Sequence, residues 1–272
     1  MGNNFSFILG HNDDELPALG LMNQAYKAGN LKSIWITNGD SNTNEDREAE
    51  SRNGIRHFGI TEGLEFWHYS QIKLFDSIIN REYNPFSEIY SRLEQEIIKS
   101  KPSSVYTCAF EGGNIIHDLL NYMVHGIING INKFGSIKII GYEFPQYHFE
   151  NGRIIFGRFG KQNPVESEDI IQQYALSDEE FSRKLAATNE HFSQQDYFQQ
   201  IKNIIGIGWE QFARIEVYRQ MHHERDYTKK PVDIIYYELY GQEKIANGKY
   251  SSPITFNDFV KIIKFLKEKQ KP

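Results

Sequence analysis

Two kinds of segment alternate along the first half of the chain: short apolar runs, and longer stretches whose apolar residues recur every three or four positions. The short runs predict strands, and the longer stretches predict amphipathic helices. The predicted strands cover residues 5–9, 31–37, 64–69, 105–110 and 137–142. The predicted helices cover 19–28, 45–58, 85–99 and 119–131. This alternation favours an α/β fold, a Rossmann-like doubly wound and mostly parallel sheet with helices on both faces.

The alternation weakens from residue 152 onward. The predicted elements there are a strand over 153–159, a helix over 177–192, a helical stretch over 198–220, a strand over 233–239 and a helix over 256–267. Ser177 with Glu180 three residues later has the spacing of a capping box at a helix start. We therefore predict a Rossmann-like core over residues 1–150 and a mixed C-terminal α/β extension over 151–272, packed on the core as one structural unit.

Composition and charge mainly exclude classes of partner and location. Thirty Lys and Arg against 36 Asp and Glu give a net charge of -6, and no basic block precedes Phe265, so we expect no nucleic-acid partner. No run approaches the ~20 apolar residues of a membrane span, and Met1 to Leu9 has no basic region typical of a signal peptide. The single Cys108 lies in an apolar run, which predicts a buried, unreactive thiol and a cytoplasmic location. The oligomeric state is not specified by these patterns.

Polar residues gather directly after the first predicted strand, in the sequence His11-Asn12-Asp13-Asp14-Glu15. In a doubly wound sheet, sites lie in the crevice beyond the carboxyl ends of the strands, so this loop is a candidate site. The alternative is structural: Asp13 or Asp14 caps the following helix, with the acids in solvent near its positive end.

A second cluster follows the strand at 105–110 and runs from Glu111 to Asp118, through a Gly-Gly pair that lets the backbone turn closely. His117 begins the next helix and can face the same crevice as His11. Two imidazoles and one carboxylate, from His11, Asp14 and His117, suit catalytic zinc with an open position for water, and leave Asp13 as a base. A histidine that only packs at a helix start is the alternative for His117.

Five motifs together resemble the PIG-L/LmbE-like N-acetylglucosaminyl deacetylases over about the first 195 residues. They are His11 to Glu15, Thr37-Asn38-Gly39-Asp40, Arg47 with Glu50, Glu111 to Asp118, and Lys184 to Ala187 with Ser193-Gln194. The resemblance implies a catalytic core that removes an N-acetyl group from an amino sugar or amino-sugar conjugate. It further implies that His11, Asp14 and His117 bind one Zn2+, that Asp13 is the general base, and that Arg47 contacts the sugar.

Two positions depart from the family pattern. Asn12 replaces a proline, which removes no functional group. Asn114 replaces the first histidine of a His-x-x-His pair; it can still donate a hydrogen bond to an oxyanion but cannot titrate. His148, after the last strand of the core, is the residue we expect to supply an imidazole to the substrate side of the crevice, with a surface loop contact as the alternative.

Three other functions are alternatives to deacetylation. Asn114 also fits a carbohydrate-binding relative that has lost catalysis. A ligand set of two histidines and one carboxylate also occurs in non-haem iron oxygenases, although the spare Asp13 beside it suits hydrolysis better. A nucleotide-binding protein is disfavoured, because the first loop has carboxylates in place of a glycine-rich phosphate site.

Overall fold

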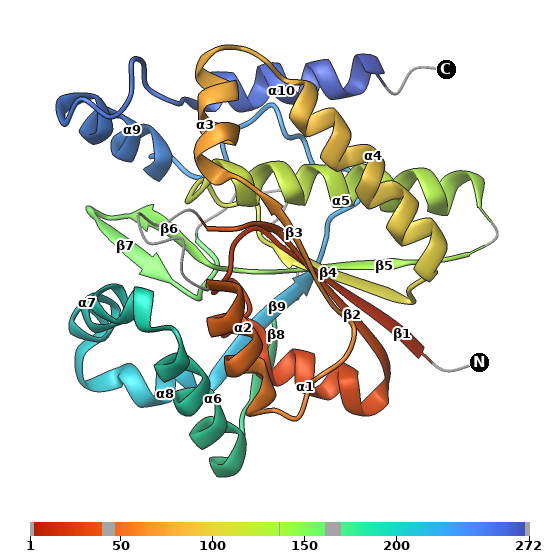
Figure 1. Ribbon diagram of the computed structural model, residues 1–272, viewed down its shortest axis with the longest axis vertical. Coiled ribbons are helices and arrows are strands. Elements are labelled where there is room, and N and C mark those ends of the chain that lie inside the picture. Colours follow the sequence, from red (N-terminus) through yellow and green to blue (C-terminus); the bar gives the residue numbers. More distant parts are fainter. Residues whose placement is uncertain (1–2, 40–46, 136, 161–169, 270–272) are drawn as a thin grey trace.

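The computed structural model describes residues 3–39, 47–135, 137–160 and 170–269. Within them, seven strands form one sheet in the order β3-β2-β1-β4-β5-β9-β8 (Figure 1). The strands are β1 (Asn3–Leu9), β2 (Gly29–Thr37), β3 (Leu64–Tyr69), β4 (Ser104–Cys108), β5 (Ile140–Phe144), β8 (Gln172–Ala175) and β9 (Ile215–Gln220). The first five run parallel, whereas β9 is antiparallel to both β5 and β8. The predicted α/β class and the mostly parallel sheet are thus confirmed.

Helices cover both faces of this sheet. One face carries α3 (Gln71–Ile79), α4 (Asn84–Ser100), α5 (Ile115–Phe134) and α10 (Phe256–Lys269), and the other carries α1 (Leu19–Ala28), α2 (Arg47–Arg56), α6 (Asp178–Glu190) and α7 (Gln195–Ile205) (Figure 1). Successive residues of a strand point to opposite faces of the sheet. Ile8 therefore packs on the face that carries α5, while Phe7 and Leu9 pack on the face that carries α1. All three are fully buried, which explains the continuous apolar run of β1.

Two predictions in the second half of the chain are wrong. The helix expected over 198–220 ends at Ile205, and after the short helix α8 (Trp209–Ala213) the chain forms β9. The strand expected over 233–239 is instead the helix α9 (Tyr236–Ala246). The strand expected over 153–159 is shorter: β7 (Arg153–Phe156) forms a separate hairpin with β6 (Tyr147–Glu150).

The other predicted elements agree with the structure to within a few residues. The capping box of Ser177 and Glu180 is present, and the four apolar residues of α10 that we expected to face inward are buried. Residues 45 and 46 of the predicted second helix lie outside the described residues. Because β8 and β9 extend the main sheet, much of the chain after residue 150 is joined to the first half by hydrogen bonds. The domain boundary at residue 150 stays a prediction.

A buried carboxylate ties the antiparallel strand β9 to the parallel strands. Glu143 on β5 accepts hydrogen bonds from Arg219 Nε at 2.7 Å and from the two terminal nitrogens of Arg225 at 2.6 and 2.7 Å. Asn121 on α5 donates to the same carboxylate at 2.7 Å. Burial alone would raise the pKa of Glu143, but the two guanidinium groups lower it below its usual range.

Replacing Glu143 with glutamine should lower the free energy of unfolding by about 3–5 kcal/mol, because it leaves buried guanidinium charge without its counter-ion. The lowered pKa means that this stability is fully present above pH ~4.5, the value for an unperturbed glutamate, and is lost as the pH falls further. Urea unfolding at a series of pH values from 8 down to about 2.5 measures both effects. Arg183→Ala, which breaks an exposed pair with Glu179, should cost less than about 1 kcal/mol. An equally small loss for Glu143→Gln would contradict the expectation.

Candidate active site

The loop after β1 folds back so that His11 and Asp14 face the same side. Asp14 Oδ2 accepts hydrogen bonds from the backbone amides of Gly10 and His11, both at 2.8 Å. The turn requires a φ of 126° at Asp13, in the left-handed region that aspartate tolerates better than most residues. The same loop is anchored to β2, where the Thr37 hydroxyl donates to the Gly10 carbonyl at 2.8 Å.

His117, in the first turn of α5, meets this loop at the carboxyl end of the parallel strands. Its Nε2 lies 2.9 Å from His11 Nδ1 and 3.1 Å from Asp14 Oδ1. All three side chains are buried, and one ligand atom from each lies within 4.8 Å of the others. Burial opposes the charged forms, but the histidines hold the pKa of Asp14 well below its usual range, and Asp14 raises that of His117.

These residues fit a divalent ion by their chemistry. Two imidazole nitrogens and a carboxylate oxygen, converging in a buried position, form the donor set of many catalytic zinc sites. The outer nitrogens, His11 Nε2 and His117 Nδ1, have no hydrogen-bond partner in the part of the chain that the structure describes. The contacts within the group and the packing around it therefore orient the two rings.

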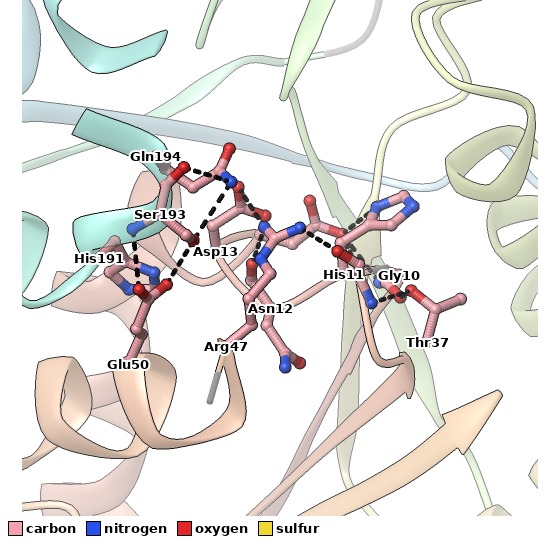
Figure 2. Close-up of polar contacts among 12 residues, drawn as sticks. Gly10, His11, Asn12, Asp13, Thr37, Arg47, Glu50, His191, Ser193 and Gln194 are labelled. Carbon is pink, nitrogen blue, oxygen red and sulfur yellow. Dashed lines mark hydrogen bonds and ion pairs between the residues drawn. The ribbon is translucent and has the colours of Figure 1, made fainter. Parts of the chain in front are cut away.

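Asp13 lies beside this group and is held from two directions. Arg47 Nη2 pairs with Asp13 Oδ2 at 2.8 Å (Figure 2). The Asp13 amide donates to Glu15 Oε2 at 3.0 Å. Burial raises the pKa of Asp13 and the nearby Arg47 opposes that rise only in part. A carboxylate with a raised pKa is better suited to exchange protons near neutral pH.

Arg47 was expected to contact a sugar, and the structure gives it a role inside the protein. It also donates to the carbonyl oxygens of Gly39, at 2.7 Å, and of Asn12. Its side chain thus joins α2 to the loops after β1 and β2 (Figure 2). Arg47 still lines the cavity described below, so a sugar contact stays a prediction.

Sequence reasoning assigned no role to the residues that support Asp13 from behind. Glu15 Oε2 accepts from Trp35 Nε1 at 2.9 Å, and Glu15 Oε1 lies 3.2 Å from His191 Nε2. Burial would raise the pKa of Glu15, but His191 lowers it. Close by, Glu50 accepts from the amide and hydroxyl of Ser193 at 2.8 and 2.6 Å (Figure 2). The signals in the sequence were Glu15 in the first motif, Glu50 in the motif with Arg47, and Ser193-Gln194 in the last motif.

Asn114, the residue in place of a histidine, forms the N-cap of α5. Its Oδ1 accepts from the Ile116 amide at 2.9 Å, which satisfies one of the free amides at the helix start. Burial raises the pKa of Tyr147, and the nearby Asn114 side chain opposes that rise only in part. The rise still prevails, so this phenol is protonated at neutral pH and can donate a hydrogen bond.

The cap can be separated from the amide donor by substitution. Asn114→Ala should lower the free energy of unfolding by about 0.5–2 kcal/mol, as the loss of an N-cap does, whereas Asn114→Asp should preserve it. Chemical denaturation of the two variants checks this difference. If the two lose the same stability, the cap contributes nothing and Asn114 stands there for another reason.

His148 does not face the crevice. Its fully buried ring lies with Nδ1 3.7 Å from Glu111 Oε2 and Nε2 3.3 Å from Glu150 Oε2, and it is not among the residues that line the cavity. Glu111 in turn accepts from the amides of Gln146 and Tyr147 at 2.6 and 2.9 Å. His148 therefore packs behind the wall that carries Tyr147.

Cys108 is buried at the end of β4, as expected, and burial raises the pKa of its thiol well above the usual value. It has the character of a core residue rather than of a nucleophile.

A cavity of about 430 Å³ contains the side chains of His11, Asp14 and His117 and extends well beyond them. Its volume is in the range of small-molecule sites. His11, Asp13, Asp14, Asn114 and His117 all line it. Most of the remaining wall is aromatic or aliphatic and comes from the second half of the chain. In the described residues, no helix has both the length and the apolar character needed to cross a membrane.

No protein-family model matches the sequence, and no curated protein matches it either. Several solved structures are similar to this chain. The zinc-inhibited form of a teicoplanin deacetylase covers 80% of this chain and 97% of its own, with a TM-score of 0.56 and 11% identity. An N,N'-diacetylchitobiose deacetylase from Pyrococcus horikoshii covers 81% and 84%, with a TM-score of 0.55 and 14% identity. The chain has the fold of the PIG-L/LmbE-like deacetylases.

A deacetylase of the antimicrobial A40926 pseudoaglycone is also similar, with a TM-score of 0.53 and 14% identity over 83% of this chain and all of the other. At such identities the likeness establishes the LmbE-like fold. Deacetylases are therefore among the structural neighbours of this chain. Its buried group of His11, Asp14 and His117 suits a metal ion.

Proposed function

We propose that the protein is a zinc-dependent hydrolase that removes an N-acyl group, acetyl in the simplest case, from an amino sugar or amino-sugar conjugate. The observation that carries the proposal is the convergence of His11, Asp14 and His117 with a second carboxylate, Asp13, in one cavity. The deacetylases among the structural neighbours support the same reaction class.

His11, Asp14 and His117 would hold the ion, which when bound would polarise an amide carbonyl and acidify a water molecule. Asp13 accepts the proton of the attacking water at its carboxylate and delivers it to the amide nitrogen. The C–N bond breaks, a C–O bond forms, and the products are a carboxylic acid and a free amine. Arg47 orients the Asp13 carboxylate through the ion pair at 2.8 Å.

Position 114 holds an asparagine in place of the family's histidine. Another residue must therefore donate a hydrogen bond to the carbonyl oxygen of the amide. The neutral phenol of Tyr147, which lies near Asn114 and lines the same cavity, is the donor that supports the reaction best in this chain. A phenol donates without titrating near neutral pH, so proton delivery to the amine stays with Asp13. Asp13 is therefore the proposed catalytic base, and Asn114 is proposed to position the Tyr147 phenol.

The test is to incubate the zinc-loaded protein without oxygen, together with N-acetylated amino sugars in free, nucleotide-linked and glycan-borne form. We expect release of acetate and of a free amine, measured on the same samples. Release without oxygen excludes an oxygenase. Binding of a sugar without release from any member of the panel would show a carbohydrate-binding protein and overturn the hydrolase.

A further inference from the structure

Tyr147 lies between two groups of aromatic residues that line the cavity. From the metal-binding group, ring contacts run from His117 to Tyr147, with centroids 5.9 Å apart, then to Phe156 at 6.1 Å and Tyr197 at 5.8 Å. A second series runs from Tyr147 to Tyr236 on α9, at 5.9 Å. Two regions of the cavity wall, which we call arms, therefore meet at Tyr147, one formed with α7 and α8 and the other with α9. The helices α7 and α8 lie on one side of the β6–β7 hairpin, and α9 lies on the other (Figure 1).

The two arms differ in chemistry. The first, which we term the α7–α8 arm, presents ring and aliphatic surface from β7, α7, α8 and β9. Its wall includes Phe156, Ile201, Trp209, Phe212 and Val217, together with Tyr197, which adds a hydroxyl group. The second arm offers the hydroxyl groups of several tyrosines, such as Tyr236 and Tyr240, beside their rings. Sugar hydroxyls need hydrogen-bond partners when they lose water, so a sugar suits the second arm better than the first.

Charged side chains border the α7–α8 arm, but they are engaged within the protein. Lys184 pairs with the buried Glu216 at 2.8 Å, and Glu216 accepts from two backbone amides at the start of α1. Arg158 donates to the carbonyl oxygens of Gly157 and Phe212, and its guanidinium lies 4.4 Å from the Phe212 ring centroid. These contacts leave an apolar lining as the surface that the arm offers to a ligand.

We infer that the α7–α8 arm binds the hydrocarbon chain of an N-acyl group longer than acetyl. This inference rests on the proposed function, because hydrolysis requires the amide carbonyl to lie at His11, Asp14 and His117. The carbonyl has two substituents: the amine, with its sugar, lies toward the tyrosines of α9, and the acyl carbon continues along Phe156 into the arm. The favoured substrate class is thus an amino sugar with a medium-chain N-acyl group.

The test is a series of glucosamines with N-acetyl, N-butanoyl, N-hexanoyl and N-octanoyl groups, assayed for free amine with the zinc-loaded protein. Each methylene that enters an apolar site favours binding about fourfold, so kcat/KM should rise at least ~10-fold from acetyl to hexanoyl. Octyl N-acetylglucosaminide, which has the chain on the glycosidic oxygen, should gain less. A larger gain for that glycoside would overturn the acyl assignment.

Ile201→Trp is the informative variant, because Ile201 is a half-buried α7 residue that lines the arm and a larger ring there should fill it. It should remove the gain for the longer chains. Ile204→Trp, on the same helix at a position 46% exposed, is the matched control and should keep the gain. A gain that survives Ile201→Trp places the chain elsewhere and overturns the inference.

Binding separates failure of the arm from failure of the hydrolase. Calorimetry of N-octanoylglucosamine with zinc-loaded Asp13→Asn protein, with and without Ile201→Trp, needs no turnover. Tight binding that Ile201→Trp weakens at least ~10-fold supports the arm even if no amide is hydrolysed, in which case the proposed reaction alone is wrong. Turnover of the acetyl compound with no preference for the octanoyl compound in rate or binding overturns the arm alone.

Discussion

Asp13→Asn should lower kcat for amide hydrolysis by about 10²- to 10⁴-fold, the usual contribution of a positioned general base. Asparagine has nearly the shape of aspartate and also tolerates the left-handed backbone at this position, where φ is 126°. Arg47 would keep its hydrogen bonds to the carbonyls of Gly39 and Asn12. The loop should therefore survive, and the loss should fall on proton transfer.

Three measurements make this result specific to the base. The zinc content and the melting temperature of Asp13→Asn should match those of the parent protein, while kcat falls and KM changes little. Asp76→Asn, the same exchange at an exposed position on α3, should leave all of them unchanged. Turnover of Asp13→Asn within about threefold of the parent would assign the base to another group.

The parallel half of the fold and the location of the candidate site could be predicted from the sequence because both depend on local patterns. Strand runs such as Phe5 to Leu9 are buried on both faces, and polar residues that follow them fall at one edge of the sheet. His11 and His117, 106 residues apart, were expected to meet for this reason, and they do. That they bind a metal stays a prediction.

The predictions for β9 and α9 were wrong because tertiary contacts overrode the local pattern. The apolar residues between Phe198 and Phe212 recur at helical spacing, and buried charges at Glu216 and Arg219 hide the alternation of β9. In α9, adjacent tyrosines favour a strand by propensity, but the helix buries Tyr237 and Gly241 four residues apart. A side chain at Gly241 would come within 3.1 Å of the Ile254 amide nitrogen, a contact between distant segments that local propensity cannot show.

Asn114 illustrates a different limit. Compared with the family motif it is a lost imidazole, and only the structure shows how its side chain is used. Its oxygen caps α5, and the side chain lies near Tyr147, whose pKa it lowers against the effect of burial. The partner Tyr147 is 33 residues away and belongs to no motif, so the sequence pointed to His148, the next residue, which packs behind the cavity wall.

Loss of one metal ligand should have the largest effect on hydrolysis of any single substitution. Zinc that binds only the folded state stabilises it by about 2.7 kcal/mol at 100 times its Kd, which should raise the melting temperature by on the order of 5 °C or more. His117→Ala removes a nitrogen that lies 2.9 Å from His11 Nδ1 and 3.1 Å from Asp14 Oδ1, so we expect this rise, the bound zinc and the hydrolysis to disappear together. His223→Ala, at an exposed histidine outside the cavity, should keep all three. Because melting and metal analysis do not depend on turnover, a His117→Ala protein that keeps one zinc per chain would refute the ligand set even if no substrate had been found.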